Sequence, residues 1–265
     1  MLSAIQLTPD QTFEFLLNVA ITRPVFLWGA PGIGKSALVR RFADEVGMEC
    51  VSLLGSQLAP EDLLGIPQID GQCSRFYPPA NIVRDKPFVL FLDELNASSH
   101  EIQKAFYSLI LEQRIGEYRL PEGTVVIGAG NRAKDAAIVK PMPSALINRM
   151  VHVHLRADHR QWLHWAINES SIHPWVVEYI QLRPDQLWNE PPKHEEPFST
   201  PRSWHMLSDA LKSFGETISD EMLEALIYGL LSPAHAASFK GFIKQIRQKH
   251  TVSSILKGDA NWPDD

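Results

Sequence analysis

Short apolar runs recur along the first 155 residues and predict the strands of a sheet. Five runs of five residues have this character, at 24–28, 50–54, 88–92, 124–128 and 151–155. Apolar residues at helical spacing occur between some of them, at 35–46 and at 99–113. Strands that alternate with helices predict an α/β fold, with a mainly parallel five-stranded sheet flanked by helices.

Local start signals accompany two of the predicted helices. Thr8, Pro9 and Gln11 have the order of an N-cap, a first-turn proline and a capping-box partner. Ser98 and Glu101 have the spacing of the same box before the helix at 99–113. Such residues accept or donate the hydrogen bonds that the first turn of a helix leaves unmade.

Beyond about residue 156 the strand pattern stops and only helical patterns follow. They begin at Asp158, at Pro174, at Thr200-Pro201, near residue 219 and at Ser232-Pro233. A stretch rich in proline and charge, at about 183–200, predicts a loop among these helices. We therefore expect two domains, an α/β domain at 1–156 and an all-helical domain at 157–265.

The composition limits the classes of partner. The 265 residues are 45% apolar, enough for a sizeable core, and carry a net charge of −6. An acidic balance argues against nucleic acid as the main partner, since phosphate backbones favour a basic face. Cys50 and Cys73 have no metal or redox spacing, and no apolar run has the length of a membrane span. Because the N-terminus lacks a signal-peptide pattern, we expect a cytoplasmic protein.

One segment carries a phosphate-binding pattern, G-x-x-x-x-G-K-S at residues 29–36. The segment follows an apolar run that ends at Trp28, and a helical pattern that Gly47 can end begins within it. It therefore joins a predicted strand to a predicted helix. In such a loop the backbone N–H groups face one anion, the lysine reaches the β- and γ-phosphates, and the serine ligates Mg²⁺. We expect a nucleoside triphosphate to bind at Gly29, Ala30, Pro31, Gly32, Ile33, Gly34, Lys35, Ser36 and Ala37.

Polar side chains end two further apolar strands. Asp93 and Glu94 follow the run 88–92, and Asn131 ends a later run. Ligands bind at the carboxyl edge of such sheets, so we expect Asp93 to hold Mg²⁺ together with Ser36. Glu94 can orient and deprotonate the attacking water, and Asn131 can donate to the γ-phosphate or hold that water. Taken alone, these residues also fit ordinary acidic and asparagine turns.

Two arginines follow later in the chain. Arg149 precedes the last strand, and Arg202 lies in the first turn of a helix after Thr200-Pro201. Phosphoryl transfer needs positive charge beside the γ-phosphate, and an arginine fork supplies it. A single surface arginine is usually a solvated charge, so it is their place in the whole pattern that makes these two residues candidates.

Together the motifs resemble those of the AAA+ ATPases, and more narrowly of the MoxR-like branch. The matching segments span most of residues 24–205 in the family order: GAPGIGKS at 29–36, FLDELNAS at 91–98, the stretch from Gln103 to Asn131, MPSALINRM at 142–150 and STPRSW at 199–204. The resemblance implies that the nucleotide is ATP, that Lys35 and Ser36 are the Walker A pair, and that Asp93 and Glu94 are the Walker B pair.

The resemblance also implies roles for three later residues. Asn131 matches sensor 1, Arg149 the arginine finger that acts on ATP held by the neighbouring subunit, and Arg202 sensor 2 of a helical lid. Arg132 stands where many relatives have proline, so it competes with Arg149 for the trans role. The expected catalytic set is Glu94, Lys35, Asn131, Arg149 and Arg202, with Ser36 and Asp93 at the metal.

The family carries inserted hairpins, and two segments match them. Asp70-Gly71 favours a tight turn and makes 68–72 a plausible hairpin tip. A second hairpin is expected around 116–123. In the family such hairpins face the pore of a ring or a partner.

We expect a ring-forming ATPase, commonly a hexamer of identical subunits, that uses hydrolysis to remodel a protein client. By resemblance, the client is often a protein with a von Willebrand factor A-type domain. A DNA-associated loader or transposition regulator is an alternative, against which the acidic charge counts. A nucleotide-gated switch or small-molecule kinase is another, although residues 131–135 lack the Asn-Lys-x-Asp order of a guanine reader.

Overall fold

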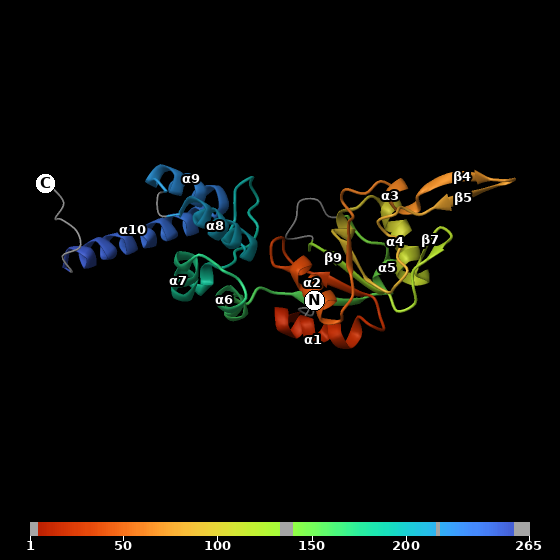
Figure 1. Ribbon diagram of the computed structural model, residues 1–265, viewed down its shortest axis with the longest axis horizontal. Helices are drawn as coiled ribbons and strands as arrows, with labels where there is room; N and C mark the ends of the chain where they lie inside the picture. The colour runs from red at the N-terminus through yellow and green to blue at the C-terminus, as the bar shows by residue number, and fades with distance from the viewer. Residues whose placement is uncertain (1–4, 133–139, 216–217, 257–265) are drawn as a thin grey trace. The chain divides into compact units, whose positions relative to one another are not determined.

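The computed structural model of the chain describes residues 5–132, 140–215 and 218–256. The chain divides into two compact units, Met1–Ala157 and Asp158–Asp265. Figure 1 shows an α/β arrangement in the first unit and helices in the described part of the second. Residues 133–135 of the segment compared with a guanine reader lie outside the described residues.

Six parallel strands form the central sheet of the first unit. Their order across the sheet is β1 (Gln6–Leu7), β10 (Val151–Leu155), β2 (Val25–Trp28), β9 (Val125–Gly130), β6 (Val89–Asp93) and β3 (Cys50–Leu54). The predicted α/β fold is confirmed, and five strands coincide with the five apolar runs. The prediction of five strands is one short, because the two residues of β1, which pair with β10, are too few to show a periodicity.

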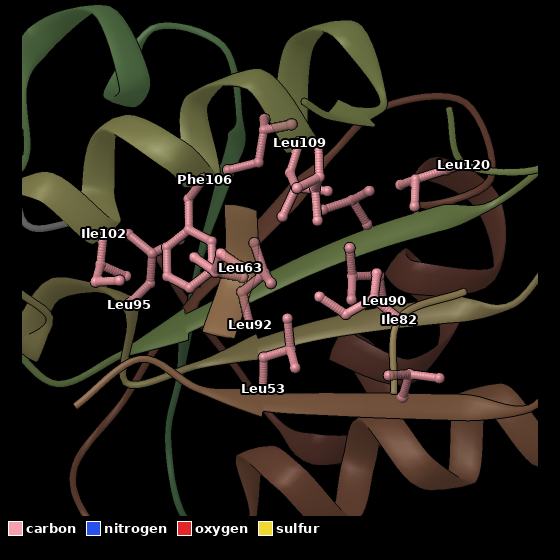
Figure 2. Close-up of a cluster of buried hydrophobic side chains, with 14 of the residues drawn as sticks. Leu53, Leu63, Ile82, Leu90, Leu92, Leu95, Ile102, Phe106, Leu109 and Leu120 are labelled. Atoms are coloured by element: carbon pink, nitrogen blue, oxygen red, sulfur yellow. The ribbon is translucent and has the colours of Figure 1, made fainter. Parts of the chain in front are cut away.

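The sheet is buried on both faces because successive side chains of each strand point to opposite sides. In β6, Phe91 belongs to the cluster formed with α1 (Pro9–Val19) and α2 (Lys35–Glu45), whereas Leu90 belongs to the cluster formed with α4 (His100–Glu112). Figure 2 shows this second cluster, in which Ile102, Phe106 and Leu109 of α4 lie over Leu53, Leu90 and Leu92 of the strands. Both clusters are well buried, so the edge of the sheet rests on a rigid support.

Local start signals set the ends of the helices, with one correction. The capping box of Thr8 and Gln11 is present at the start of α1. At α4 the N-cap is Ser99, whose hydroxyl accepts the Ile102 N–H, and not the predicted Ser98. Ser98 instead donates to the Leu95 carbonyl and closes the short 3₁₀ turn η1 (Leu95–Ala97).

Both expected hairpins are present in the first unit. The first joins β4 (Ile66–Asp70) to β5 (Cys73–Tyr77) through a turn at Gly71, where φ is +65°. The second joins β7 (Arg114–Ile115) to β8 (Tyr118–Arg119) and so begins two residues before the expected range. In Figure 1 the β4–β5 hairpin extends away from the sheet.

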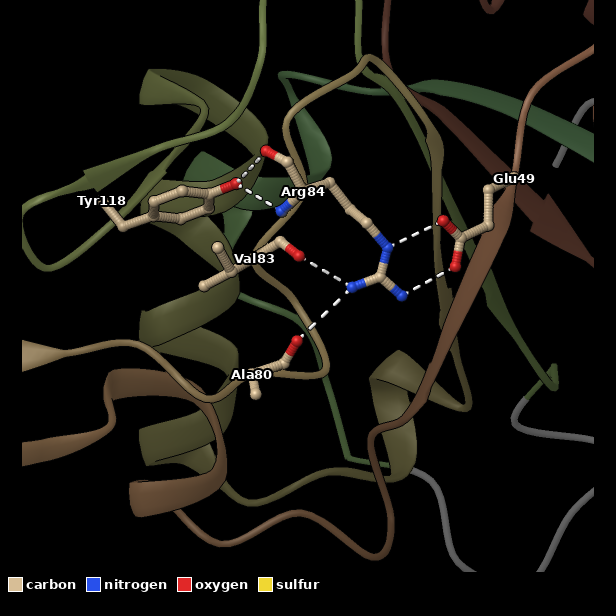
Figure 3. Close-up of polar contacts among 5 residues, drawn as sticks. All are labelled: Glu49, Ala80, Val83, Arg84 and Tyr118. Carbon is tan, nitrogen blue, oxygen red and sulfur yellow. Dashed lines mark hydrogen bonds and ion pairs between the residues drawn. The ribbon is translucent and has the colours of Figure 1, made fainter.

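Arg84 joins the second hairpin to the body of the first unit (Figure 3). Its guanidinium makes two hydrogen bonds to the Glu49 carboxylate, of 2.7 and 2.8 Å. Its backbone N–H donates to the Tyr118 hydroxyl at 2.9 Å, and that hydroxyl donates to the Arg84 carbonyl at 3.0 Å. The arginine lowers the pKa of Glu49, mainly through the hydrogen bond. Because the fork is bidentate, it fixes the direction as well as the position of the loop before β6.

The second unit is a helical bundle around an aromatic core. Trp204 is fully buried, packs against Tyr179 and Phe239, and donates its indole N–H to the Gln186 carbonyl at 3.0 Å. No helix in the described part of the chain is long and apolar enough to cross a membrane. The elements of this unit are α6 (His159–Asn168), α7 (Pro174–Leu182), η2 (Pro184–Gln186), α8 (Pro201–Phe214), α9 (Asp220–Leu230) and α10 (Pro233–Leu256), with α3 (Glu61–Leu64) and α5 (Ser144–Ile147) as short helices of the first unit.

The N-cap of α7 makes the stability of the second unit depend on pH. His173 Nδ1 accepts the Trp175 N–H at 3.2 Å, which only an unprotonated nitrogen can do. Burial, followed by the charge of Lys212, lowers the pKa of His173. The unfolded chain therefore binds a proton at His173 more readily than the folded chain does. The stabilisation that this cap contributes is complete above a pH of about 6.5, and it is lost as the pH falls from there through the lowered folded-state pKa.

We expect the amides of α7 to lose protection against hydrogen exchange between about pH 7.5 and pH 5, after correction for the intrinsic rates. In His173→Asn the cap keeps a side-chain acceptor that does not titrate, so this loss should be smaller. His235 of the same unit also has a pKa lowered by burial and stays in both proteins, which makes the difference between them specific to residue 173. Equal pH dependence in the two proteins would contradict the assignment.

Candidate nucleotide-binding site

The phosphate loop joins β2 to α2 at the carboxyl edge of the sheet. Gly32 and Gly34 have φ of +73° and +103°, a region that side chains with a Cβ rarely adopt. A Cβ on Gly29 would lie 3.1 Å from Ile33 Cγ2, so the first glycine is confined by packing. Gly34 is also the N-cap of α2, and the loop therefore ends where the positive end of that helix begins.

Lys35 is folded back onto the loop and onto a neighbouring strand. Its ammonium donates to the Gly29 carbonyl at 2.7 Å, the Ala30 carbonyl at 3.1 Å and Asn131 Oδ1 at 2.8 Å. The side chain is buried, and these three acceptors match the three protons of the ammonium. The structure thus brings together two residues that the sequence separates by 96 positions.

Ser36 and Asp93 meet beside this lysine. The Ser36 hydroxyl donates to Asp93 Oδ2 at 2.7 Å, and Asp93 Oδ1 accepts the Glu94 N–H at 2.9 Å. Hydroxyl and carboxylate oxygens are the hard ligands that Mg²⁺ prefers. Lys35 and the amide oxygen of Asn131 lie at the same edge of the sheet. The donors present therefore fit a triphosphate with a divalent cation.

Glu94 lies next to Asp93 but has different surroundings. Its backbone is in the left-handed region, with φ of 52°, which is rare for a residue with a Cβ. One of its carboxylate oxygens accepts a short hydrogen bond from the Ser56 hydroxyl. Ser56 follows Gly55, whose N–H donates to the Asp93 carbonyl at 2.8 Å. A Cβ on Gly55 would lie 3.1 Å from the Glu94 carbonyl oxygen, which is a tight contact. The pattern of the sequence did not single out Ser56, because it only becomes a neighbour of Glu94 through the pairing of β3 with β6.

Asn131 is held by a second asparagine that the sequence analysis missed. Asn96 Nδ2 donates to the Asn131 carbonyl at 2.7 Å, and Asn96 Oδ1 accepts the Asn131 N–H at 3.3 Å. Asn96 is only 1% exposed, and a Cβ on Gly130 would lie 2.3 Å from its Oδ1. The only signal in the sequence is its place in the segment that follows Asp93 and Glu94, which gives no hint of the partner.

The two candidate arginines belong to different units of the chain. Arg149 is exposed in the turn after α5 and contacts Tyr107 of α4, with its guanidinium carbon 4.9 Å from the ring centroid and a hydrogen bond to the hydroxyl. Arg202 is exposed in the first turn of α8, in the second unit. Arg132 directly follows Asn131 and is half-buried.

Comparison with known proteins agrees with this geometry. Residues 24–150 match the family described as AAA domain (dynein-related subfamily). The chain is 30% identical over 185 residues to midasin of Giardia intestinalis, which covers 62% of this chain and 4% of midasin. It is 28% identical over 148 residues to the ATP-dependent zinc metalloprotease FtsH 3 of Phytoplasma mali (strain AT), which covers 51% of this chain and 23% of that protein. The chain therefore spans less than a quarter of the length of these relatives.

A solved structure shows the same fold. A mutant of RuvB from Thermotoga maritima superposes with a TM-score of 0.50 at 16% sequence identity, over 88% of this chain and 71% of that one. The first unit thus combines a phosphate-loop pattern with the fold of that structure, and its residues 24–150 are similar to the AAA domain family.

The buried pairing of Asn96 with Asn131 should hold the end of β9 in place. In Asn96→Ala the Asn131 N–H and C=O lose their partners, at a cost of about 1–3 kcal/mol. We expect protection of the Asn131 amide against hydrogen exchange to fall by about 5-fold to 100-fold. Asn168→Ala removes one exposed bond to the His164 carbonyl and serves as the matched control, with no change at Asn131. Unchanged protection in Asn96→Ala would show that the pairing does not hold the strand end.

Proposed function

We propose that this chain is a MoxR-like AAA+ ATPase, which hydrolyses ATP with Mg²⁺ between the subunits of a ring and uses the reaction to remodel a partner protein. The observation that carries the proposal is the convergence of four side chains at one edge of the sheet. Lys35 lies 2.8 Å from Asn131, and Ser36 lies 2.7 Å from Asp93. These are the groups that phosphoryl transfer requires for positioning the phosphates and the cation.

In this proposal the loop and the start of α2 bind the triphosphate. The backbone N–H groups of the loop face the phosphates, and Lys35 exchanges its carbonyl acceptors for β- and γ-phosphate oxygens. Bound ATP–Mg²⁺ supplies the phosphoanhydride bond that water cleaves. Ser36 and Asp93 hold the cation, directly or through its water shell. The nucleotide-binding residues are Gly29, Ala30, Pro31, Gly32, Ile33, Gly34, Lys35, Ser36 and Ala37.

Glu94 and Asn131 act on the attacking water. Glu94 takes its proton as general base, and the left-handed backbone at this residue directs its carboxylate differently from that of Asp93. The Ser56 hydroxyl occupies one Glu94 oxygen and leaves the other for water. Asn131, fixed by Asn96, donates its amide N–H₂ to the γ-phosphate or orients the water.

Arg149 completes the site of the neighbouring subunit, and Arg202 reports the γ-phosphate to the helical lid at 157–265. Arg149 is exposed and contacts Tyr107 of α4, which suits a role in trans. An arginine placed on the γ-phosphate in the transition state contributes about 10³- to 10⁵-fold in rate. Hydrolysis then depends on assembly, for which a hexamer is the expected ring.

The partner is proposed to be a protein with a von Willebrand factor A-type domain in the cytoplasm. The β4–β5 hairpin is a candidate contact, because Ile66, Ile69 and Phe76 are 67%, 87% and 43% exposed. Exposed apolar side chains on a projecting hairpin offer a surface for another protein.

Mixing two inactive variants tests the trans arrangement. Glu94→Gln lacks the base and Arg149→Ala lacks the finger, so each alone should hydrolyse ATP at least about 100-fold more slowly than the native protein. In a one-to-one mixture, an Arg149→Ala subunit beside a Glu94→Gln subunit has a complete site. Random assembly places about a quarter of the interfaces in this order, so about a quarter of the native rate should return.

A matched control separates the finger from a general loss of charge. Arg41 also stacks on an aromatic ring, that of Phe13, and pairs with an exposed carboxylate, Asp10. Arg41→Ala should keep its activity, and Arg149→Ala should bind a fluorescent ATP analogue within about threefold of the native affinity. A mixture that stays inactive, although both variants assemble, would overturn the trans arrangement.

The acidic charge distinguishes the proposal from the alternatives. At a net charge of −6 we expect no binding of single- or double-stranded DNA in low salt, measured by gel shift with and without ATP–Mg²⁺. Salt-dependent binding would favour a DNA-associated loader or transposition regulator. A protein that stays monomeric with ATP in sedimentation, and still hydrolyses it, would favour a switch or a small-molecule kinase.

A further inference from the structure

Two hydrogen bonds join the strand before the phosphate loop to the turn that carries Arg149. Trp28 Nε1 donates to His152 Nδ1 at 2.9 Å, and His152 Nε2 lies 2.8 Å from the Ile147 carbonyl oxygen. Trp28 is the last residue of β2 and directly precedes Gly29. Ile147 is the last residue of α5, two positions before Arg149.

The partners of His152 determine its protonation. An indole N–H can only donate and a carbonyl can only accept. Nδ1 must therefore carry a lone pair, and Nε2 must carry the proton that it donates to Ile147. The imidazole is neutral, in a single tautomer, and cannot turn about its ring axis without losing both bonds.

Ring packing holds the same imidazole from the side. Its centroid lies 6.0 Å from that of Trp28, with 25° between the planes, and 5.7 Å from that of Phe26. Phe26 in turn has space only because β9 carries glycine beside it, since a Cβ on Gly128 would lie 2.8 Å from the ring. His152 is therefore held by ring packing as well as by its two hydrogen bonds.

The turn between α5 and β10 has weaker bonds of its own. The Arg149 N–H donates to the Leu146 carbonyl at 3.3 Å, and the Met150 N–H donates to the Ile147 carbonyl at 3.4 Å, both beyond the usual length. The Ile147 carbonyl accepts hydrogen bonds from the Met150 N–H and from His152 Nε2, and the bond from His152 is the shorter. The turn is also anchored by the buried side chains of Leu146 and Met150, and the bond from His152 adds a short attachment of the Ile147 carbonyl to the sheet.

We propose that His152 is a positioning residue for Arg149, with Trp28 as its anchor. His152 holds the end of α5 at a fixed distance from the strand that leads into the phosphate loop, and so presents the guanidinium at a defined place to the neighbouring subunit. The inference rests on the proposed trans role of Arg149. Misplacing a group by about 1 Å costs about 100-fold in rate, which makes such a support necessary.

The mixture of Glu94→Gln and Arg149→Ala subunits tests this role by placing one substitution in two positions. His152→Phe keeps an aromatic ring and removes both hydrogen bonds. In the Glu94→Gln subunit, which supplies the finger, it should lower the recovered hydrolysis by about 5-fold to 100-fold. In the Arg149→Ala subunit, which has no finger to position, the recovered rate should stay within about twofold.

Other outcomes overturn the proposal. Equal loss in both positions would mean that His152 only stabilises the fold, and no loss in either would mean that it does not position Arg149. If the mixture without any change at His152 recovers no activity, the trans role itself is wrong and this proposal fails with it. Failure of this proposal differs from failure of the trans role, because the two outcomes for His152→Phe can be observed only when the mixture without a change at His152 recovers activity.

Two further variants keep the test independent of folding. Trp28→Phe keeps an aromatic ring and removes the indole N–H donor. In the subunit that supplies Arg149 it should reproduce the loss, with no additional effect when combined with His152→Phe. His154→Phe is the matched control, because His154 stacks on Trp28 at 6.2 Å and its ring has no hydrogen bond to the described residues. A loss in His154→Phe as large as that in His152→Phe would contradict a role for the hydrogen bonds.

Discussion

The Lys35 ammonium is the interaction on which the candidate site depends. A buried charge is costly unless it is paired with hydrogen-bond acceptors, and Lys35 has three of them. Two are carbonyls of its own loop, and the third is Oδ1 of Asn131, which directly follows β9. The bond exists because β2 and β9 are neighbours, with Trp28 opposite Gly130, so that Gly29 and Asn131 leave the sheet at the same level. The parallel sheet thus converts distant positions in the sequence into one polar cluster.

Close packing around this cluster leaves little freedom to its members. Gly130 has no space for a Cβ because the side chains of Asn96 and Phe26 occupy it, although its φ is not positive. A Cβ on Gly55 would make tight contacts with the backbone oxygens of Glu94 and Asp93, at 3.1 and 3.3 Å. The same crowding fixes Asn131 and Glu94 before any ligand arrives, and this preorganisation is what the chemistry of a phosphate site needs.

The arginines differ from these residues in a way that fits a shared site. Lys35, Ser36, Asp93 and Asn131 satisfy one another within a single unit, whereas Arg149 projects from a short turn onto Tyr107. The cluster of Trp28, His152 and Phe26 connects that turn to the strand before the phosphate loop. One chain therefore contains both a preorganised phosphate edge and a separately supported arginine, which our proposal assigns to opposite sides of a subunit interface.

The sequence by itself determined the elements with strong local signals. Five strands, the helices between them and the capping box at Thr8 follow from apolar runs and local hydrogen bonds, and the phosphate loop follows from a pattern of neighbouring residues. The local signal placed the N-cap of α4 at Ser98, one residue before the actual cap Ser99, and no local signal predicted β1, which has only two residues.

Only the tertiary structure decided which side chains meet across the sheet. Ser56, Asn96 and His152 are ordinary residues in the sequence, and they gain their contacts with Glu94, Asn131 and Ile147 from strand order and register. No local pattern encodes these contacts, because hydrogen bonds between residues 5 to 38 positions apart depend on how whole elements pack. The phosphate-loop pattern can thus be found in the sequence itself, whereas the groups that hold Glu94 and Asn131 in place cannot.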